Sequence, residues 1–191
     1  VKKLYRKFVS SAQVSALETF DFGNEIVTKA IGQWIFTNNG KKILDYTGGY
    51  GVLNHGHNHP RILKTRINFQ ENDRMEVHKN YLSQYLASLS HNIASLLPKD
   101  LNKIYLPNSG AEANEGAIKL AYKYFNGKKK YILHSDISFH GKLLGTGSIS
   151  NSPESNFKFP ELKNTDYFIY NDINSLKQKI SEHKDDIYCI I

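Results

Sequence analysis

The hydrophobic and polar positions divide the chain into a β-rich first third and a later part in which strands and helices alternate. Apolar and β-branched residues concentrate in residues 25–30, 33–37 and 42–46. Ile31-Gly32 separates the first two of these segments and Asn39-Gly40 separates the last two. Because such dipeptides favour tight hairpin turns, we expect a small antiparallel β-meander in this part of the chain.

The middle of the chain carries helical signals. Pro60 is suited to open a helix, because its fixed φ matches the first helical position. Further along, apolar residues recur at intervals of three and four, which predicts a helix whose apolar stripe packs into the core. The stripe consists of Tyr81, Leu82, Tyr85, Leu86, Leu89, Ile93 and Leu96.

From residue 103 onward short apolar strands alternate with amphipathic helical segments. Because parallel strands need crossover connections, this order predicts an α/β fold whose mainly parallel sheet is covered by helices on both faces. The Ser-, Asn- and Pro-rich stretch Ser148–Asn164 predicts a loop. We expect strands at 103–106, 131–134, 167–170 and 187–191, and helices at about 111–126 and 172–182, with a further short helix after residue 134.

These patterns suggest two parts. Residues 1–60 form an N-terminal segment with the meander and a glycine-rich turn, and residues 61–191 form the first part of an α/β domain. The chain starts with Val1 and ends in an apolar β-run that would need covering partners in a finished sheet. We therefore expect residues 1–191 to be part of a longer polypeptide.

Charge and composition narrow the class of protein. The net charge is +7, but the lysines are scattered, and the run Lys128–Lys130 follows a helix-stopping Gly127. No basic stripe interleaved with aromatic residues accompanies the charge, so we expect no nucleic-acid partner. Cys189 is the single cysteine and lies in an apolar strand, which predicts a reducing compartment. Since no apolar run is long enough to cross a bilayer, we expect a soluble, cytoplasmic protein without a membrane partner.

The chemistry centres on Leu106–Ala121, where a short apolar segment passes through a small-residue turn into a helix. Ser109 is a good N-cap, and the amides of Gly110 and Ala111 would point out of the helix N-terminus. Unpaired amides and the helix dipole favour a phosphate there, and glycine lets it approach the backbone closely. The alternative is an ordinary helix cap without a ligand.

Two further segments accompany this junction: the glycine-dense residues 44–62, and Ser138–Thr146 after a strand. In this order and at these spacings, the three segments resemble the class III, or omega-type, aminotransferases. These are pyridoxal-phosphate enzymes of fold type I. The resemblance runs from about residue 20 to the end of the chain and implies pyridoxal 5′-phosphate as the cofactor.

The resemblance also implies roles for single residues around that cofactor. Ser109, Gly110 and Ala111 match the family's turn that grips the cofactor phosphate. Phe139 occupies the position before His-Gly at which the family carries an aromatic residue against the pyridine ring, although such a residue alone is also typical of a core. The resemblance makes His140 an orienting or packing residue of the cofactor site.

Three more positions are assigned by the same resemblance. Glu115 matches an acid that supports the loops around the cofactor, with an exposed helix acid as the alternative. Tyr50 lies in the glycine-rich segment, where a side chain faces the substrate. Lys142 falls where many members carry arginine; lysine provides a point charge for a substrate carboxylate instead of two parallel hydrogen bonds.

Alternate histidines at His55, His57 and His59 could in principle ligate a metal from one face of an extended segment. No cysteine or acid lies at ligand spacing in the sequence, so we expect no metal. The resemblance instead explains this segment as a turn packed near a subunit interface.

The residues that perform the chemistry are not expected within this sequence. Pyridoxal-phosphate enzymes need a lysine that forms a Schiff base with the cofactor and an acid on the pyridine nitrogen. In the family both follow a strand end like Ile-Ile-Glu-Pro, and here the sequence stops at Ile191. We therefore assign no catalytic residue in residues 1–191 and expect this segment alone to be inactive.

For the complete protein, the resemblance implies a homodimeric transaminase that moves an amino group from a primary amine or amino acid to a 2-oxo acid. One alternative is an aminomutase or racemase of the same family. The other is a truncated, non-catalytic protein that binds the cofactor or acts as a scaffold.

Overall fold

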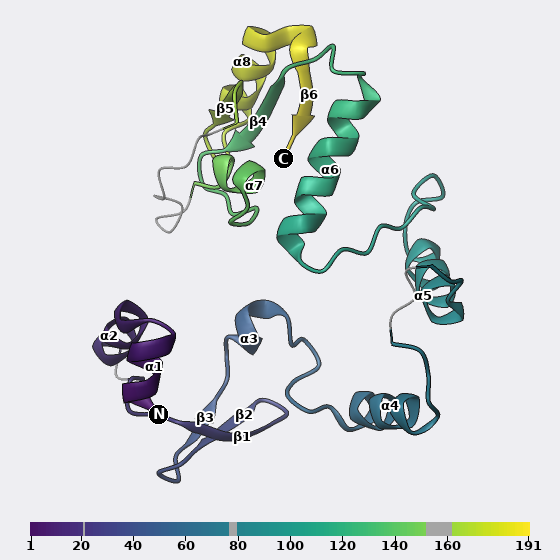
Figure 1. Ribbon diagram of the computed structural model, residues 1–191. Coiled ribbons are helices and arrows are strands. Elements are labelled where there is room, and N and C mark those ends of the chain that lie inside the picture. The colour runs from purple at the N-terminus through teal and green to yellow at the C-terminus, as the bar shows by residue number, and fades with distance from the viewer. Residues whose placement is uncertain (21, 77–79, 152–161) are drawn as a thin grey trace. The chain divides into compact units, whose positions relative to one another are not determined.

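The computed structural model describes residues 1–20, 22–76, 80–151 and 162–191 (Figure 1). The chain forms two compact units, Val1–Leu82 and Ser83–Ile191. The division into domains at residue 60 concerns the whole protein and stays a prediction. In the described part of the chain, no helix is both long enough and apolar enough to cross a membrane.

The first unit begins with two helices that the sequence patterns do not predict, α1 (Lys2–Phe8) and α2 (Ser11–Thr19). Glu18 of α2 pairs with Lys2 and Arg6 of α1, at 2.8 Å and 2.7 Å. These partners are too far apart in sequence to appear in a helical period. Ion pairs between α1 and α2 therefore connect two helices whose own sequences show little amphipathic pattern.

The predicted meander is confirmed. Strands β1 (Val27–Ile31), β2 (Trp34–Thr37) and β3 (Lys42–Leu44) pair antiparallel in chain order. The turns between them contain Gly32 and Gly40, whose φ values of 57° and 83° lie in the left-handed region that glycine adopts without strain.

The glycine-dense segment after the meander forms a tight turn, α3 (Gly48–Gly51), in which Gly49 and Tyr50 have left-handed backbone conformations. Helix α4 (Pro60–Glu71) then begins at Pro60, as predicted. His57 pairs with Gly32 through two backbone hydrogen bonds of 2.8 Å. This pairing connects the end of the glycine-dense segment to the meander.

The second unit begins with α5 (Gln84–Ser95), which confirms the predicted helix but not its burial. Ser83 caps it by accepting a hydrogen bond from the Leu86 N–H at 3.2 Å. None of the α5 residues, all of which the structure describes, is buried. The prediction of a core stripe is therefore wrong, because a helical period is local whereas burial requires a packing partner.

Residues 103–106 belong to no strand within the described ranges, so this predicted strand is also wrong. A strand needs a neighbour to satisfy its backbone, and this segment instead lies against helix α6 (Gly110–Tyr124). A Cβ atom added at Gly116 of α6 would lie 2.9 Å from Cε1 of Tyr105. The helix is followed by Asn126 and Gly127, which both have positive φ.

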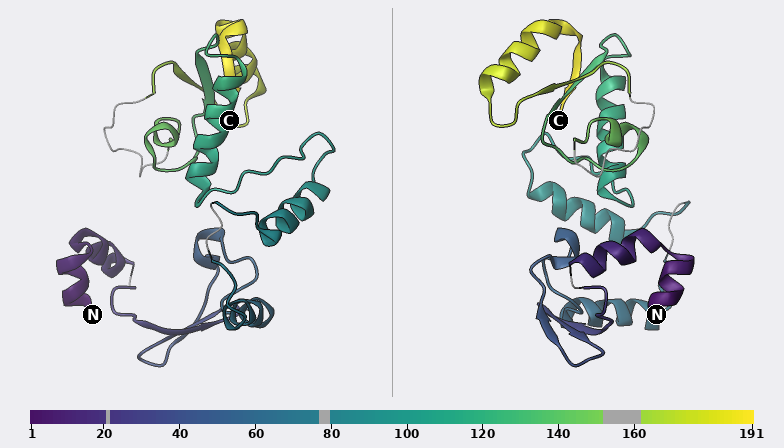
Figure 2. Two further views of the ribbon diagram at one scale, coloured as in Figure 1. Left: turned by 45° about the vertical axis from the view of Figure 1, so that its right-hand side comes forward. Right: turned by 90° about the vertical axis from the view of Figure 1, so that its left-hand side faces the viewer.

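The sheet of the second unit is parallel, in the order β5-β4-β6, and confirms the α/β fold class. The chain passes from the central strand β4 to the edge strand β5 and then back across β4 to the other edge strand β6, so the two connections run in opposite directions along the sheet. Right-handed crossovers in opposite directions lie on opposite faces. Helices α6 and α7 accordingly cover one face and α8 the other (Figure 2). The elements are β4 (Tyr131–Ser135), α7 (Leu144–Ser148), β5 (Thr165–Phe168), α8 (Ile173–His183), the 3-10 turn η2 (Lys184–Asp186) and β6 (Ile187–Ile190).

The core of this unit lies between α6 and the sheet. Ile118, Ile132 and Ile149 are buried together, and Tyr188, Cys189 and Ile191 pack against them. Most of the predicted loop Ser148–Asn164 lies outside the described residues. The core fixes α6 beside β4, and thus fixes the helix start relative to the segment that follows β4.

Candidate functional site

The start of α6 leaves backbone donors available to a ligand. Ser109 is the N-cap, and its Oγ accepts a hydrogen bond from the Glu112 N–H at 3.2 Å. The N–H groups of Gly110 and Ala111 have no acceptor within the helix, because the first turn never has one. A Cβ atom added at Gly110 would meet no atom within 4 Å. The end of the helix is therefore both capped and open to an anion.

The segment after β4 presents an aromatic ring and a histidine. Phe139 is 59% exposed, so the alternative that it belongs to the core is wrong. The adjacent His140 is half-buried, and its Nε2 has no hydrogen-bond partner among the described residues. Burial, with a smaller contribution from His134, lowers the pKa of His140. The segment thus carries an exposed aromatic residue followed directly in sequence by a half-buried histidine.

Direct contacts join this segment to the start of α6. Asn114 Nδ2 donates a hydrogen bond to the His140 carbonyl at 2.9 Å. A Cβ atom added at Gly141 would lie 2.9 Å from Cα of Ala111, so only glycine allows this approach. The structure therefore places the predicted phosphate turn against the segment that carries the predicted ring contact.

Glu115 also contacts this segment and is not an isolated exposed acid. Its Oε1 accepts a hydrogen bond from the backbone N–H of Thr146 at 2.9 Å. A Cβ atom added at Gly145 would lie 2.6 Å from the same oxygen. The contact supports the predicted role of Glu115 as a support for the loop.

The two residues assigned to the substrate are both exposed. Lys142 follows the Gly141 contact in the second unit, on the same segment as Phe139. Tyr50 belongs to the first unit, and its side chain is 99% exposed with a φ of 59°. The second unit thus brings together the predicted cofactor contacts and Lys142, and Tyr50 lies outside it.

An acid absent from the sequence predictions organises the turn around Tyr50. Asp45 Oδ1 accepts hydrogen bonds from the Thr47 hydroxyl at 2.7 Å, the Thr47 N–H at 2.9 Å and the Gly48 N–H at 3.0 Å. Its Oδ2 lies 2.8 Å from Nε2 of His57. Hydrogen bonds from Thr47 and then His57 lower the pKa of Asp45 to about 2.

This contact corrects one sequence-based statement about the histidines. An acid does lie beside His57, since folding brings Asp45 across twelve residues of chain. His55 and His59 instead approach each other edge to face, with ring centroids 6.2 Å apart. Within the described residues, the three histidines do not form a group with metal-ligand spacing.

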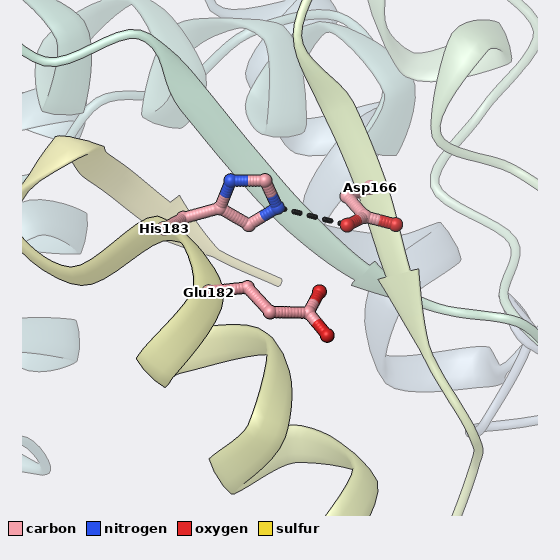
Figure 3. A group of neighbouring side chains, drawn as sticks. All are labelled: Asp166, Glu182 and His183. Atoms are coloured by element: carbon pink, nitrogen blue, oxygen red, sulfur yellow. Dashed lines mark hydrogen bonds and ion pairs between the residues drawn. The ribbon is translucent and has the colours of Figure 1, made fainter.

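A different cluster, Asp166, Glu182 and His183, brings three possible ligand atoms within 4.8 Å of one another (Figure 3). Asp166 Oδ2 lies 2.8 Å from His183 Nε2 and 3.0 Å from Lys179 Nζ. The same ammonium group lies 3.0 Å from Glu182 Oε2. Because Lys179 already supplies a cation between the two carboxylates, the cluster is an ion-pair network that connects α8 to β5.

The pKa values agree with this description. Burial raises the pKa of Asp166, but hydrogen bonds from His183 and Lys179 outweigh it and hold that pKa below its usual value. The same network raises the pKa of Lys179, chiefly through the hydrogen bond to Asp166. The His183 ring also stacks on Tyr131 with centroids 3.9 Å apart.

Sequence reasoning missed Asn114 and Thr146, which connect α6 to the Phe139 segment, and Ser150, which bonds to the backbone of His140. Their partners are contributed by the fold: Asn114 and His140 are 26 residues apart, and Glu115 and Thr146 are 31 apart. The one available signal was small, polar composition next to His-Gly. That composition is too common to assign a contact.

Comparison with known proteins gives a family match and consistent structural neighbours. The family model described as Aminotransferase class-III matches residues 21–188. The chain is 37% identical over 157 residues to an acetylornithine aminotransferase of Bacillus anthracis, covering 81% of this chain and 39% of that protein. It is 31% identical over 162 residues to a succinylornithine transaminase/acetylornithine aminotransferase of Pseudomonas aeruginosa, covering 82% and 39%. The chain thus spans about two fifths of the length of these curated relatives.

Solved structures share the fold at lower identity. One is an adenosylmethionine-8-amino-7-oxononanoate aminotransferase of Methanocaldococcus jannaschii, with a TM-score of 0.85 and 21% identity. The match covers 99% of this chain and 45% of that protein's chain. Another is a taurine:2-oxoglutarate aminotransferase of Bifidobacterium kashiwanohense, solved in complex with PLP and glutamate, with a TM-score of 0.73 and 19% identity. The match covers 94% of this chain and 47% of that protein's chain. These likenesses show a fold type I arrangement.

Proposed function

Because this chain belongs to the class-III aminotransferase family, we propose that the protein transfers an amino group from a primary amine or amino acid to a 2-oxo acid, with pyridoxal 5′-phosphate as cofactor. One observation carries the proposal. The Asn114 hydrogen bond to His140 holds the open amides of α6 next to the segment that bears Phe139. A ligand that carries both a phosphate and an aromatic ring could therefore bind the α6 amides with the phosphate and Phe139 with the ring.

The residues of this chain suit such a ligand. The amides of Gly110 and Ala111, with the Ser109 hydroxyl, would hold the phosphate, and the open space at Gly110 admits it. Phe139 would cover one face of the ring and exclude water from it. When bound, pyridoxal phosphate supplies an electron sink for the carbon atom next to the amine.

The neighbouring residues would orient these contacts. Burial lowers the pKa of His140, so this imidazole gains its proton at lower pH than an exposed histidine does. At neutral pH it therefore adds no positive charge that would compete with the α6 amides for the phosphate. Glu115 fixes the turn at Thr146 and so limits movement of the segment between them.

For the substrate, we propose that Lys142 and Tyr50 face the amine donor, and that Lys142 attracts a carboxylate as a point charge. The names of the curated relatives make acetylornithine, as N2-acetylornithine, the first donor to test. The name of the taurine:2-oxoglutarate aminotransferase makes 2-oxoglutarate the first acceptor. The lysine that binds the cofactor covalently is not assigned to any lysine of residues 1–191. We further propose a homodimer located in the cytoplasm, in line with the family resemblance.

The test uses the complete protein as its gene encodes it, incubated with pyridoxal phosphate, N2-acetylornithine and 2-oxoglutarate. The proposal expects glutamate to accumulate in proportion to the enzyme, and expects Ser109→Asp to abolish it, because a carboxylate at the helix start repels the phosphate. The exposed α6 variant Lys119→Ala serves as the matched control and retains activity. Cofactor uptake with rearranged or racemised donor and no glutamate would overturn the transaminase assignment, and no uptake would overturn the proposal entirely.

A further inference from the structure

We propose that Asn114 is a positioning residue that sets the spacing between the phosphate-binding end of α6 and the ring of Phe139. This inference rests on the proposed function, because it concerns how two parts of one cofactor site are held together. It goes beyond that function by assigning a role to a residue outside the proposed cofactor contacts, whose side chain bonds to the backbone next to Phe139.

The position of Asn114 on the helix makes this role possible. Asn114 lies four residues after Gly110 and three after Ala111, so its side chain shares their face of α6. On that face Ala111 contacts Gly141, and the Asn114 amide reaches the neighbouring His140 carbonyl at 2.9 Å. One hydrogen bond thus connects the start of the helix to the peptide unit that follows His140, one residue beyond Phe139.

The other side of His140 is held as well. Its N–H donates to Ser150 Oγ at 2.8 Å, and the Ser150 hydroxyl donates to the Thr146 carbonyl at 2.7 Å. Ser150 and Thr146 are buried, so these bonds are shielded from water. The backbone of His140 is therefore fixed between Asn114 on one side and Ser150 on the other.

Phe139 depends on this arrangement because its own side chain is mostly exposed. A ring with little packing around it takes its position from the backbone that carries it. A ligand with a phosphate and a ring gains the full affinity of both contacts only when their sites lie at a matching distance. Loss of the Asn114 bond should therefore weaken the joined ligand more than either half alone.

The experiment measures binding to the complete protein by calorimetry, with three probes. The first is 4-deoxypyridoxine 5′-phosphate, which resembles the cofactor but lacks the aldehyde and so cannot react with a lysine. The second is inorganic phosphate, and the third is 4-deoxypyridoxine without the phosphate. Asn114→Ala should weaken the first probe about fivefold to tenfold, as expected for one hydrogen bond, and weaken inorganic phosphate less than about twofold.

Two more variants keep the test decisive. Asn114→Leu has a similar size, adds no charge and cannot donate to the carbonyl, so it should weaken the three probes as Asn114→Ala does and can replace the alanine variant if that variant folds poorly. Ser150→Thr keeps the hydroxyl acceptor for the His140 N–H and should retain more affinity than Ser150→Ala. Lys119→Ala, on the exposed side of α6, should bind all three probes as the unaltered protein does.

A second readout follows the ring itself. The near-ultraviolet circular dichroism of bound 4-deoxypyridoxine 5′-phosphate should decrease at saturation in Asn114→Ala, because the ring is held less firmly. Equal weakening of all three probes, or unchanged binding and dichroism, would overturn the inference. If the unaltered protein fails to bind 4-deoxypyridoxine 5′-phosphate, it is the proposed function that fails instead.

Discussion

Asp45 Oδ2 lies 2.8 Å from Nε2 of His57, and this contact connects the residue before the glycine-rich turn to the histidine after it. The other carboxylate oxygen of Asp45 accepts hydrogen bonds from Thr47 and Gly48. One side chain therefore anchors both ends of the segment that carries the exposed Tyr50. The turn needs such an anchor because Tyr50 has a left-handed backbone conformation, which is unfavourable for a tyrosine.

The stability of this turn should depend on acid pH. The pKa of Asp45 is about 2 in the folded chain and 3.8 ordinarily, so the folded state favours the carboxylate. Its contribution is fully present above pH 3.8 and is lost as the pH falls from there through about 2. The protection of the Gly48 amide against exchange, measured by nuclear magnetic resonance relative to the intrinsic rate at each pH, should decrease over this range. In Asp45→Asn this protection should already be lower at neutral pH and show no such step.

Replacing Glu115 should cost stability through the buried N–H that it satisfies. Glu115→Ala leaves the Thr146 N–H without its acceptor, and Thr146 has no exposed surface. We expect the free energy of unfolding to fall by about 1–3 kcal/mol, as for an unsatisfied buried group. Glu115→Gln retains an acceptor oxygen and should cost less than about 1 kcal/mol in the same urea titration. Equal losses for the two variants would contradict the role of this hydrogen bond.

Replacement by alanine should destabilise the fold at Gly141 but not at Gly110. At Gly141, with φ 131°, a Cβ atom would lie 2.9 Å from both Ala111 Cα and Thr146 Oγ1. Gly141→Ala should therefore lower the free energy of unfolding by about 2 kcal/mol or more. Gly110→Ala meets open space and should change it by less than about 1 kcal/mol. Its methyl group should nevertheless weaken 4-deoxypyridoxine 5′-phosphate, a difference that calorimetry and urea unfolding together would reveal.

Two substitutions of Ser109 should distinguish its role as a helix cap from its role in binding phosphate. Ser109→Ala removes the acceptor for the Glu112 N–H and should cost about 1 kcal/mol of stability. Ser109→Asp keeps an N-cap acceptor and should preserve stability to within about 0.5 kcal/mol, yet its charge should repel a phosphate. Thermal unfolding and phosphate titration of both variants would check this. Undiminished phosphate binding by Ser109→Asp would contradict a phosphate at this helix start.

The features that the sequence predicted well depend on local signals. Helix α6 follows from the Ser109 cap and the small-residue period after it, and the meander follows from its glycine turns. Helix α4 likewise begins at Pro60, where the fixed backbone angle favours a first helical position. In each case the determining residues lie within one or two turns of the element they define.

The features that were mispredicted or missed depend on partners distant in sequence. Residues 103–106 have strand composition, but a strand requires a neighbour, and Tyr105 packs on Gly116 instead. Helices α1 and α2 are paired through Glu18, which no single helical period indicates. Asp45 beside His57 and Asn114 beside His140 are likewise products of folding. The capped helix start at Ser109 was therefore recognisable from sequence, and the residues that hold it in place were not.

A crystal structure of the complete protein with bound pyridoxal phosphate would test the proposed cofactor site most directly. We expect phosphate oxygens to accept hydrogen bonds from the N–H groups of Gly110 and Ala111, and the pyridine ring to lie on Phe139. The hydrogen bond from Asn114 to His140 should be retained. A phosphate held elsewhere in the protein, with the α6 start still exposed to solvent, would contradict the proposed site.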